Sequence, residues 1–327
     1  MAEFDLIEAI RVRCTGSRDD VRLGIGDDAA LVAVPLGQDL AVCTDTLVAG
    51  VHFPRETAPF DIGWKALAVN LSDLAAMGAT PAWATLALTL PHADASWVEA
   101  FADGFAALAR EYKLALIGGD TTQGPLTVTV TVHGFVPGPL ALRRAGARIG
   151  DAVYVTGTLG DAAAGLRCLD PKDAAADRLH LAPATTRDAL LARLNRPVPR
   201  VACGAVLRGR AGGCIDVSDG LLADLAHVCA ASGVGAELDA ANLPTSSALL
   251  GLFDDAERAA LQLAGGDDYE LCFTAAAQDA GELLTDLARS GCGATAIGRI
   301  VAGSGVRVRD ARGAPLVLSR RGFEHFT

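Results

Sequence analysis

Residues 22–34, with the sequence RLGIGDDAALVAV, decide between two kinds of fold. The stretch matches G-x-G-x-x-A, the pattern of a dinucleotide-binding loop. Such a loop opens a helix, and the N-terminus of that helix receives the pyrophosphate. Here the loop runs into ALVAV, which is a strand pattern, and Asp27 and Asp28 would repel a bare phosphate. We therefore reject a Rossmann loop and expect a turn between two strands.

Composition places the chain among globular proteins. Its 327 residues are 51% hydrophobic and 20% charged, enough for two domains with a real core. The net charge of −11 comes without a visible basic face, which argues against nucleic-acid binding. We expect no membrane association and no signal peptide, because no apolar run reaches membrane-spanning length and the start, MAEFDLIEAIRVR, lacks a basic leader. The 8 cysteines form no C-x-x-C, so we expect a cytoplasmic protein.

The order of periodic segments predicts two domains of α/β (α+β) type. A short helix, three strands, a helix at 61–77 and the strand WATLALTL come first. A helix at 94–113, the strand LALIGGD ending in a glycine turn, and LTVTVTVHGFV follow. Residues 136–151 are rich in Pro, Gly and Arg without a period, so we place the boundary there. We predict domains at residues 1–140 and 141–327.

Aspartates recur beside Gly, Ser or Thr, in contexts typical of strand ends and turns. Each one alone is read more simply as a turn or N-cap residue, and Asp219 as the cap of a helix at 220–231. Several in one chain favour a common site. They are Asp27, Asp28, Asp45, Asp73, Asp120, Asp216, Asp219, Asp267 and Asp268.

Converging carboxylates need a neutralising partner, and Mg²⁺ bridging to phosphates is such a partner. The chain lacks the P-loop pattern and the H-R-D and D-F-G motifs of protein kinases. Arg143 and Arg144 are the best placed basic residues for a phosphate, with a solvated loop as the equal alternative. His52 is read first as a structural residue. The segment GGDDYEL is either a pocket wall or an ordinary turn into a strand.

Seven segments together resemble thiamine-monophosphate kinases, in order from residue 4 to the GFEHF tail. They are GIGDDAA, TDTLVAGVHF, KALAVNLSDLAAMGATPAW, LIGGDTT, YVTGTLGDAAAGL, DVSDGL and GGDDYEL. The resemblance implies an N-terminal mixed-sheet domain that forms a dimeric barrel with a second subunit, followed by an α/β C-terminal domain. It also implies an ATP site in the cleft between the domains.

Carried over position by position, the resemblance implies roles for individual residues. The implied Mg²⁺ ligands are Asp28, Asp45, Asp73, Asp120, Asp216 and Asp219, with Thr44 and the carbonyl of Cys43 adding oxygens. The implied ATP contacts are Tyr112, Gly119, Asp120, Arg144 and Ser218. The implied contacts to thiamine monophosphate are His52, Asp267 and Phe323. Asp45, Asp73, Asp120 and Asp219 would carry the catalysis.

Two positions depart from the family pattern. Position 267 is commonly Glu in a GGED string and is Asp here, so its carboxylate reaches one methylene less far. The aromatic residue usual near Arg320 is absent, which leaves Phe323 as the ring for stacking.

The implied reaction is in-line transfer of phosphate from ATP to thiamine monophosphate, giving thiamine diphosphate. An acceptor phosphate with a second pKa of ~6 is largely a dianion at neutral pH and needs no general base. The alternatives are another enzyme of the same superfamily, close to aminoimidazole-ribonucleotide synthetase, and a non-catalytic metal-binding scaffold. The chain has no D-x-[DN]-x-[DN]-G spacing, which argues against an EF-hand form of the scaffold.

Overall fold

A computed structural model describes the backbone of residues 3–14 and 16–325, and the side chains from residue 5 onward within these ranges. The last residue of the GFEHF sequence, Phe326, lies outside the described residues. The chain forms two compact units, Met1–Leu74 with Ala79–Leu140, and Ala75–Gly78 with Ala141–Thr327. They are called here the N-terminal and the C-terminal unit. In the described part of the chain, no helix is long and apolar enough to cross a membrane.

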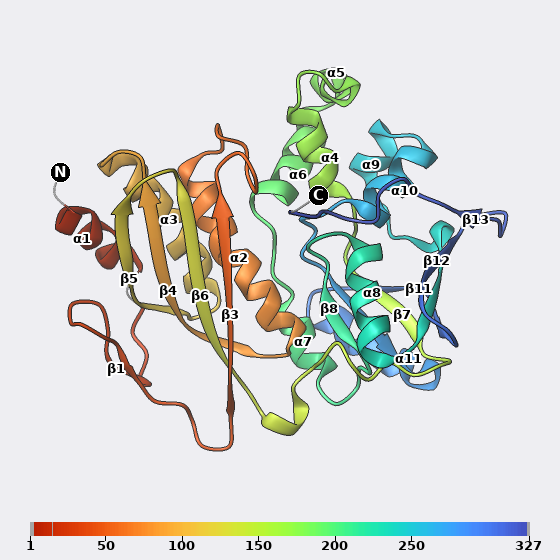
Figure 1. Cartoon of the computed structure of the whole chain (residues 1–327), viewed down its shortest axis with the longest axis horizontal. Helices are drawn as coiled ribbons and strands as arrows, with labels where there is room; N and C mark the ends of the chain where they lie inside the picture. The colour runs from red at the N-terminus through yellow and green to blue at the C-terminus, as the bar shows by residue number, and fades with distance from the viewer. Residues whose placement is uncertain (1–2, 15, 326–327) are drawn as a thin grey trace. The chain divides into compact units, whose positions relative to one another are not determined.

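The N-terminal unit is a four-stranded sheet with helices on one face (Figure 1). The strand order is β3-β6-β4-β5, antiparallel except for the parallel pair β4–β5, which confirms the predicted mixed sheet. The elements in chain order are α1 (Glu3–Cys14), β1 (Val21–Leu23), β2 (Leu31–Val32), β3 (Asp39–Val48), α2 (Pro59–Ala76), β4 (Thr80–Leu90), α3 (Ala95–Glu111), β5 (Ala115–Gln123), β6 (Thr127–Val136) and a 3₁₀ turn at Gly138–Leu140.

Strict alternation along β6 explains why one face of this sheet is buried. Val128, Val130 and Val132 are fully buried, whereas the threonines between them are only half-buried. Successive side chains of a strand point to opposite faces, so the valines face α2 and α3 and the threonines form an open face. The same alternation continues in β4, where Leu86 and Leu88 are buried on the helix side. Figure 1 shows α2 and α3 behind the strands, with the open face toward the viewer.

Strand β5 corrects one prediction. The sequence LALIGGD was expected to end in a glycine turn, but β5 runs through it to Gln123. A bulge at Ile117 shifts the pairing, so that Leu116 pairs with Ala84 and Gly118 with Thr85. A Cβ at Gly119 would overlap the carbonyl of Leu86. The glycines therefore allow two strands to approach closely at an irregular ladder, which local sequence does not distinguish from a turn.

The C-terminal unit is a seven-stranded mixed sheet in the order β13-β12-β9-β11-β7-β10-β8. All pairs are antiparallel except β9–β12. The elements in chain order are β7 (Ala152–Thr156), α4 (Asp161–Leu169), α5 (Ala174–Leu181), α6 (Ala184–Asn195), α7 (Val201–Leu207), β8 (Cys214–Asp216), α8 (Leu221–Ser232), β9 (Gly235–Asp239), a 3₁₀ turn at Ala240–Asn242, α9 (Ser247–Leu252), α10 (Asp255–Ala264), β10 (Leu271–Ala275), a 3₁₀ turn at Ala277–Asp279, α11 (Ala280–Arg289), β11 (Ala294–Val301), β12 (Gly305–Arg309) and β13 (Pro315–Leu316).

Each face of this sheet has its own core. On one face, Leu221, Leu225 and Val228 of α8 pack with Val153 and Val155 of β7. On the other, side chains of α7 and α11 pack with Tyr154 and Phe273. Because β7, β8 and β10 are buried on both faces, the loops at their ends are held on a rigid platform.

Candidate active site

The loop of residues 24–28 joins β1 and β2, an antiparallel pair, so it is a hairpin connection and not a strand-to-helix turn. Gly26 has φ +124°, a value that side chains disfavour. Asp27 and Asp28 are both exposed, and the carboxylate of Asp27 accepts the backbone N–H of Asp28 at 2.9 Å. Asp27 therefore braces the turn, which leaves Asp28 as the member of the pair expected to bind metal.

Asp45 lies in the middle of β3 and not at a strand end, so that part of the prediction is wrong. Strand β3 is at the edge of the sheet, and the N–H of Asp45 donates to Oδ1 of Asn70 in α2 at 3.1 Å. Cys43 lies two residues before Asp45, so its backbone carbonyl points to the same edge of the strand as the Asp45 N–H. The Cys43 thiol lies 3.5 Å from the Asn70 carbonyl. The Cys43 carbonyl and the Asp45 carboxylate thus both lie where β3 contacts α2.

Asp73 lies in α2, three residues after Asn70, and is half-buried. Residues three apart share one face of a helix, so Asp73 lies on the helix face that contacts β3. The fully buried Asn70 is a residue that the sequence analysis missed; its amide also donates to the Ala66 carbonyl at 3.1 Å. A fully buried amide that bonds both to its own helix and to the neighbouring strand fixes α2 against β3, and this brings Asp45 and Asp73 to the same side of the sheet.

Asp120 is exposed and lies within β5, again not at a strand end. Asp45 of β3 pairs with Val130 of β6, which pairs with Leu86 of β4, which pairs with Gly119 of β5. Asp120 follows Gly119 in β5. Alternation therefore turns Asp120 to the open face, opposite to Asp45. Within one chain, the sheet separates these two carboxylates.

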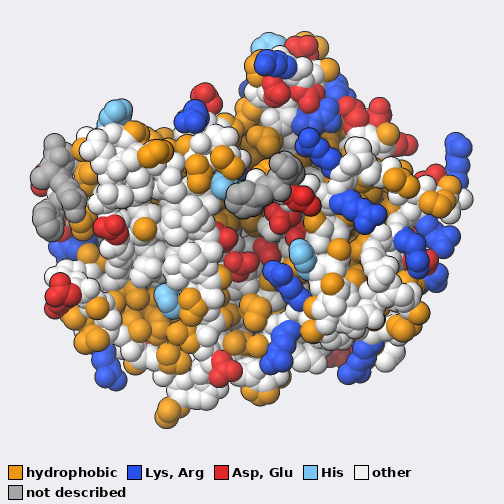
Figure 2. Space-filling model, in the orientation of Figure 1, with side chains coloured by type: hydrophobic (Ala, Val, Ile, Leu, Met, Phe, Trp, Pro, Cys, Tyr) orange, Lys and Arg blue, Asp and Glu red, His pale blue; other side chains and the backbone are white. Residues whose placement is uncertain are grey.

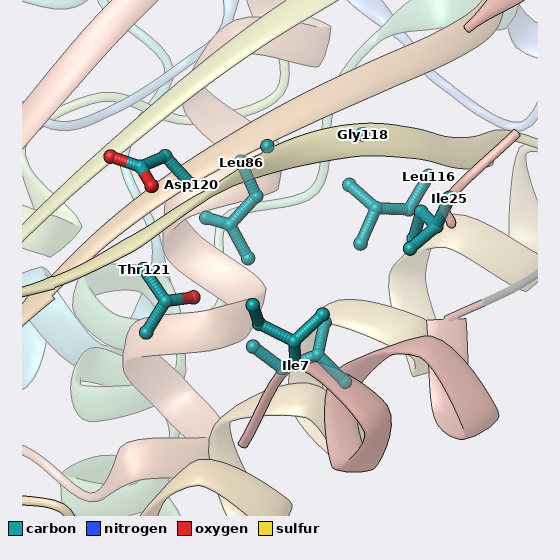
Figure 3. A pocket seen from close by; sticks show the side chains of 9 residues that line it. Ile7, Ile25, Leu86, Leu116, Gly118, Asp120 and Thr121 are labelled. Carbon is teal, nitrogen blue, oxygen red and sulfur yellow. The ribbon is translucent and has the colours of Figure 1, made fainter. Parts of the chain in front are cut away.

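The loop of residues 24–28 lies beside Asp120. Ile25 lines a small pocket of about 60 Å³ together with Ile7 and Ile10 of α1, Leu116, and residues 118–121 of β5. Figure 3 shows Thr121 pointing toward the pocket and the carboxylate of Asp120 pointing away from it. The pocket is apolar and too small for a nucleobase, so it serves to pack the loop against β5.

In the C-terminal unit, β8 ends at Asp216, which is buried, and the chain turns through residues 217–220 into α8. A second segment, residues 266–269, lies against this turn: the Asp267 N–H donates to the Ser218 carbonyl at 2.8 Å, and the Tyr269 N–H donates to the Val217 carbonyl at 2.8 Å. The DVSDGL and GGDDYEL sequences thus form one structure, although 47 residues of chain lie between Asp219 and Asp267.

The C-terminal segment joins the same place. The Phe323 N–H donates to the Asp219 carbonyl at 3.0 Å, and the ring of Phe323 is about half exposed, at 48%. Asp267, Ser218, Asp219 and Phe323, which the resemblance connects with substrate, ATP and metal, are therefore brought together by backbone hydrogen bonds.

Asp267 and Tyr269 both adopt positive φ, +67° and +51°. Such values are costly for residues other than glycine and cluster at functional sites. The Tyr269 hydroxyl donates to Oδ1 of Asp267 at 2.9 Å, so it orients the carboxylate that the resemblance assigns to the substrate. Tyr269 itself is buried. The sequence analysis did not single it out.

Asp224 is a further residue that was missed. It lies in the first turn of α8 and its Oδ2 accepts the N–H groups of Ser218, Asp219 and Gly220 at 3.0–3.1 Å. The N-cap of α8 is Gly220, without a side-chain cap, so the alternative reading of Asp219 as an N-cap is wrong. Burial, followed by the charges of Asp216 and Asp219, raises the pKa of Asp224 to about 7. The D-x-x-x-x-D spacing from Asp219 to Asp224, just after a strand, was the sequence pattern that could have identified Asp224.

Asp268 and Glu270 have structural partners inside the C-terminal unit. Both oxygens of Asp268 accept the Gly160 N–H at 2.9 Å, and burial raises the pKa of this carboxyl well above its usual range. Glu270 is fully buried and pairs with Arg193 at 2.9 Å and with Arg200 at 2.5 Å. These bonds hold the 266–270 segment rigidly on both sides of Asp267.

The remaining predicted residues have mixed surroundings. His52 accepts the Val48 N–H through Nδ1 at 3.0 Å, which supports the structural reading. Tyr112 is the half-buried C-cap of α3. Arg144 is exposed, as expected for a solvated loop. Thr44 bonds to Thr131 at 2.8 Å across the open face.

Metal ligation is not pre-assembled in the described residues. Within residues 3–14 and 16–325, no three His, Cys, Asp or Glu side chains form a group able to hold a metal ion. The donor set still suits Mg²⁺, because Asp28, Asp45, Asp73 and Asp120 are exposed or half-buried carboxylates, the hard oxygen ligands that Mg²⁺ shares with phosphates and water.

Two domain families match the chain. AIR synthase related protein, N-terminal domain, matches residues 26–136, and AIR synthase related protein, C-terminal domain, matches residues 148–311. Together the matches span most of the sequence; the first lies in the N-terminal unit except for Ala75–Gly78, and the second lies within the C-terminal unit. The chain is therefore of the AIR synthase related class.

Full-length relatives narrow this class. The thiamine-monophosphate kinase of Salmonella typhimurium is 48% identical over 326 residues, covering 99% of this chain and 98% of that protein. The crystal structure of thiamine-monophosphate kinase from Stenotrophomonas maltophilia is 53% identical, covers 94% of this chain and 96% of its own, and has a TM-score of 0.86. AaThiL complexed with AMPPCP and TMP is 33% identical, covers 99% and 97%, and has a TM-score of 0.77. The chain belongs to the thiamine-monophosphate kinase family.

Proposed function

We propose that this protein transfers the γ-phosphoryl group of ATP to the phosphate of thiamine monophosphate, giving thiamine diphosphate and ADP. The observation that carries the proposal is the likeness over 99% of the chain to AaThiL, a structure with AMPPCP and TMP bound. The joined Ser218, Asp219, Asp267 and Phe323 in the C-terminal unit agree with it, because these are the positions that the resemblance connects with nucleotide and substrate.

The chemistry of the reaction explains the residue types. The acceptor is already a dianion, so the transfer needs no general base, and the difficulty is repulsion between polyanions. Two unit charges ~4 Å apart at an effective dielectric constant of ~20 repel by ~4 kcal/mol. Mg²⁺ would supply charge neutralisation and a template for both phosphates. In this proposal Asp28, Asp45, Asp73, Asp120, Asp216 and Asp219, with Thr44 and the Cys43 carbonyl, hold several Mg²⁺ ions.

The other residues position the two substrates. Tyr112, Gly119, Arg144 and Ser218 contact ATP, and His52, Asp267 and Phe323 contact thiamine monophosphate. Asp267 and Phe323 suit a cationic thiazolium ring through charge and cation–π attraction. Tyr269 holds the Asp267 carboxylate at 2.9 Å, which compensates in orientation for the reach lost when Asp replaces Glu.

The direct test is incubation of the purified protein with Mg-ATP and thiamine monophosphate, with thiamine diphosphate and ADP measured by chromatography. We expect equimolar formation of both products and none in EDTA. Turnover of a different phosphorylated substrate, without thiamine diphosphate, would overturn the assignment. Binding of Ca²⁺ alone, without nucleotide binding, would indicate the metal-binding scaffold instead.

We further propose a homodimer formed through the open face of the N-terminal sheet. That face carries threonines of β3, β4 and β6 together with Val42, which is 54% exposed. Figure 2 shows the same face with few charged side chains. A sheet face with few charged side chains can pack on its own copy about a twofold axis, which makes a sandwich or a closed barrel. The N-terminal unit would then provide dimerisation together with Mg²⁺ and ATP contacts, and the C-terminal unit would complete the nucleotide and substrate contacts.

Val42→Glu tests this interface, because the same charge would enter it from both copies. We expect a monomer in light scattering coupled to size-exclusion chromatography. Val12→Glu, at a position 68% exposed on α1, is the matched control and should leave the mass unchanged. A dimer that survives Val42→Glu would contradict the proposed face.

Asp45 and Asp120 lie on opposite faces of the sheet, so a subunit-mixing experiment tests whether one site uses carboxylates of both copies. If Asp120 of one copy acts with Asp45 of the other, Asp45→Asn and Asp120→Asn are each inactive, whereas a refolded mixture regains activity. Random pairing gives about half heterodimers, each with one intact site, hence about a quarter of wild-type activity. A mixture as inactive as its components would mean that each site uses one chain.

We also propose a cytoplasmic location. All 8 cysteines are free, and 7 of them are buried, which suits a reducing compartment. Labelling of thiols in unfolded protein taken directly from cells should find every cysteine reduced.

A further inference from the structure

Two helices of the C-terminal unit begin directly after strands of its central sheet. Helix α8 has 12 residues and follows β8, and helix α4 has 9 residues and follows β7. The N-terminus of such a helix offers unpaired N–H groups and a partial positive charge, so a phosphate ordinarily binds there without a metal.

The turns that lead into both helices already donate to carboxylates of the chain. Asp224 accepts three successive N–H groups, those of residues 218–220, on one oxygen at 3.0–3.1 Å. Asp268 accepts the N–H of Gly160, the N-cap of α4, on both oxygens at 2.9 Å. The two residues are 3% and 1% exposed. These N–H groups are therefore already paired and are not available to an anion that arrives from solvent.

The arrangement at α8 is not an ordinary helix cap. An ordinary cap is a Ser, Thr, Asp or Asn at the N-cap position that accepts one N–H group. Here the N-cap is Gly220, and Asp224, the fourth residue of the helix, reaches back over the turn. This places a buried carboxylate near the buried Asp216 and the half-buried Asp219, whose charges act unfavourably on it. Stability alone would favour a neutral side chain at this position.

From this geometry we propose that Asp224 is a positioning residue that makes nucleotide binding depend on a divalent cation. It holds the N–H groups of residues 218–220 inward, so that the half-buried Asp219 and Ser218 side chains, and not these donors, are available to an arriving nucleotide. ATP phosphates then reach this turn through a metal ion and not through backbone N–H groups. The inference rests on the proposed function, because that function makes ATP the ligand.

Two variants of Asp224 test whether its role depends on the oxygen that accepts the three hydrogen bonds. Asp224→Asn keeps an acceptor oxygen at the same place, so turnover should stay within ~3-fold of wild type. Asp224→Ala frees the three N–H groups to bind phosphate, so the affinity for ATP in EDTA should rise ~10-fold. The same variant should have a higher KM for Mg-ATP and a lower kcat. Affinities are measured by calorimetry with ATP in EDTA and with Mg-ATP.

The ratio of the two affinities is the decisive readout, because a purely structural role would not change it. Asp151→Ala is the matched control: Asp151 is a buried carboxylate of the same unit that accepts the Arg148 N–H at 2.8 Å, and its loss should leave the ratio unchanged. An unchanged ratio in Asp224→Ala would overturn the proposal. If Asp224→Ala does not fold, a loss of more than ~100-fold in folded Asp224→Asn would overturn it as well.

The same measurements keep the inference apart from the proposed function. Absence of thiamine diphosphate in the wild-type reaction would overturn the function. The metal dependence of ATP binding in the variants tests Asp224 without using thiamine monophosphate.

Discussion

The same three letters, Gly-Asp-Asp, occur at residues 26–28 and at residues 266–268, and the two copies are built differently. In the first, both carboxylates are exposed on a hairpin loop, and the Asp28 N–H donates to the carboxylate of Asp27. In the second, Asp267 is half-buried with φ +67°, and Asp268 is buried on the Gly160 N–H. Identical local sequence therefore gives two exposed carboxylates in one place and a hydrogen-bonded, partly buried frame in the other.

The difference extends to the two units as a whole. The predicted ligands of the N-terminal unit, Asp28, Asp45, Asp73 and Asp120, keep carboxylate surface in contact with solvent. The C-terminal unit buries Asp216, Asp224, Asp268 and Glu270 and satisfies the last three with backbone N–H groups or arginines. Exposed carboxylates can exchange between water and metal, whereas buried, bonded ones position their neighbours.

The largest effect is expected where an N-terminal carboxylate acts on the reaction itself. Asp73→Asn should lower kcat ~1000-fold, since metal ligation is worth several kcal/mol to phosphoryl transfer. Steady-state kinetics and urea unfolding measure activity and stability separately. Asp61→Asn, about three turns earlier on α2, is the control and should retain activity. Full turnover by Asp73→Asn would remove it from the metal site.

The next effect tests the frame in the C-terminal unit. Glu270→Gln leaves Arg193 and Arg200 without their shared carboxylate in a buried place, and the free energy of unfolding should fall by about 3 kcal/mol. Glu282→Gln, which breaks an exposed pair with Arg210, should cost under ~0.5 kcal/mol. Equal small losses in the two variants, measured by urea unfolding, would show that burial does not distinguish the pairs.

A smaller, pH-dependent effect is expected at a partly exposed carboxylate. Hydrogen bonds from Arg178 lower the pKa of Glu257 from 4.5 to about 2. Because the folded pKa is depressed, the stabilisation is present above pH 4.5 and is lost as the pH falls toward 2. Because one quarter of the Glu257 side chain is exposed, we expect this stabilisation to be only ~1 kcal/mol. Glu257→Gln should therefore be less stable than wild type at pH 5, and this deficit should shrink at pH 3. A deficit that grows on acidification would reverse the sign of the argument.

The smallest effect concerns the open face of the N-terminal sheet. Thr46 and Thr129 bond across β3 and β6 at 2.9 Å on an exposed surface. Thr46→Val should lower the free energy of unfolding by ~0.5 kcal/mol, as is usual for a cross-strand pair. A loss above ~2 kcal/mol in urea unfolding would mean that the pair is buried, as it would be inside a dimer.

Much of the fold could be predicted from periodicity. The alternation of LTVTVTV and the helical period of residues 61–77 identified β6 and α2, because side-chain burial follows directly from strand and helix geometry. The positions of Asp45 and Asp120 in strand interiors were predicted wrongly. Asp beside Gly or Thr is typical of turns, and the ladders that hold these residues in strands are contacts with distant segments.

The site shows the same division. The acidic motifs and their kinship to thiamine-monophosphate kinases were readable from the sequence, because residue types and spacing are local properties. Asp224, Tyr269 and Asn70 were not found, since each acts through a hydrogen bond whose partner is set by the backbone path.

By itself, the sequence determined the class of elements, the mixed N-terminal sheet and the supply of carboxylates for phosphate chemistry. Only the tertiary structure decided which of those carboxylates face solvent and which brace the backbone. The physical reason is that the fate of a carboxylate depends on its desolvation and on the donors that reach it. Both are set by contacts between segments that lie far apart along the chain.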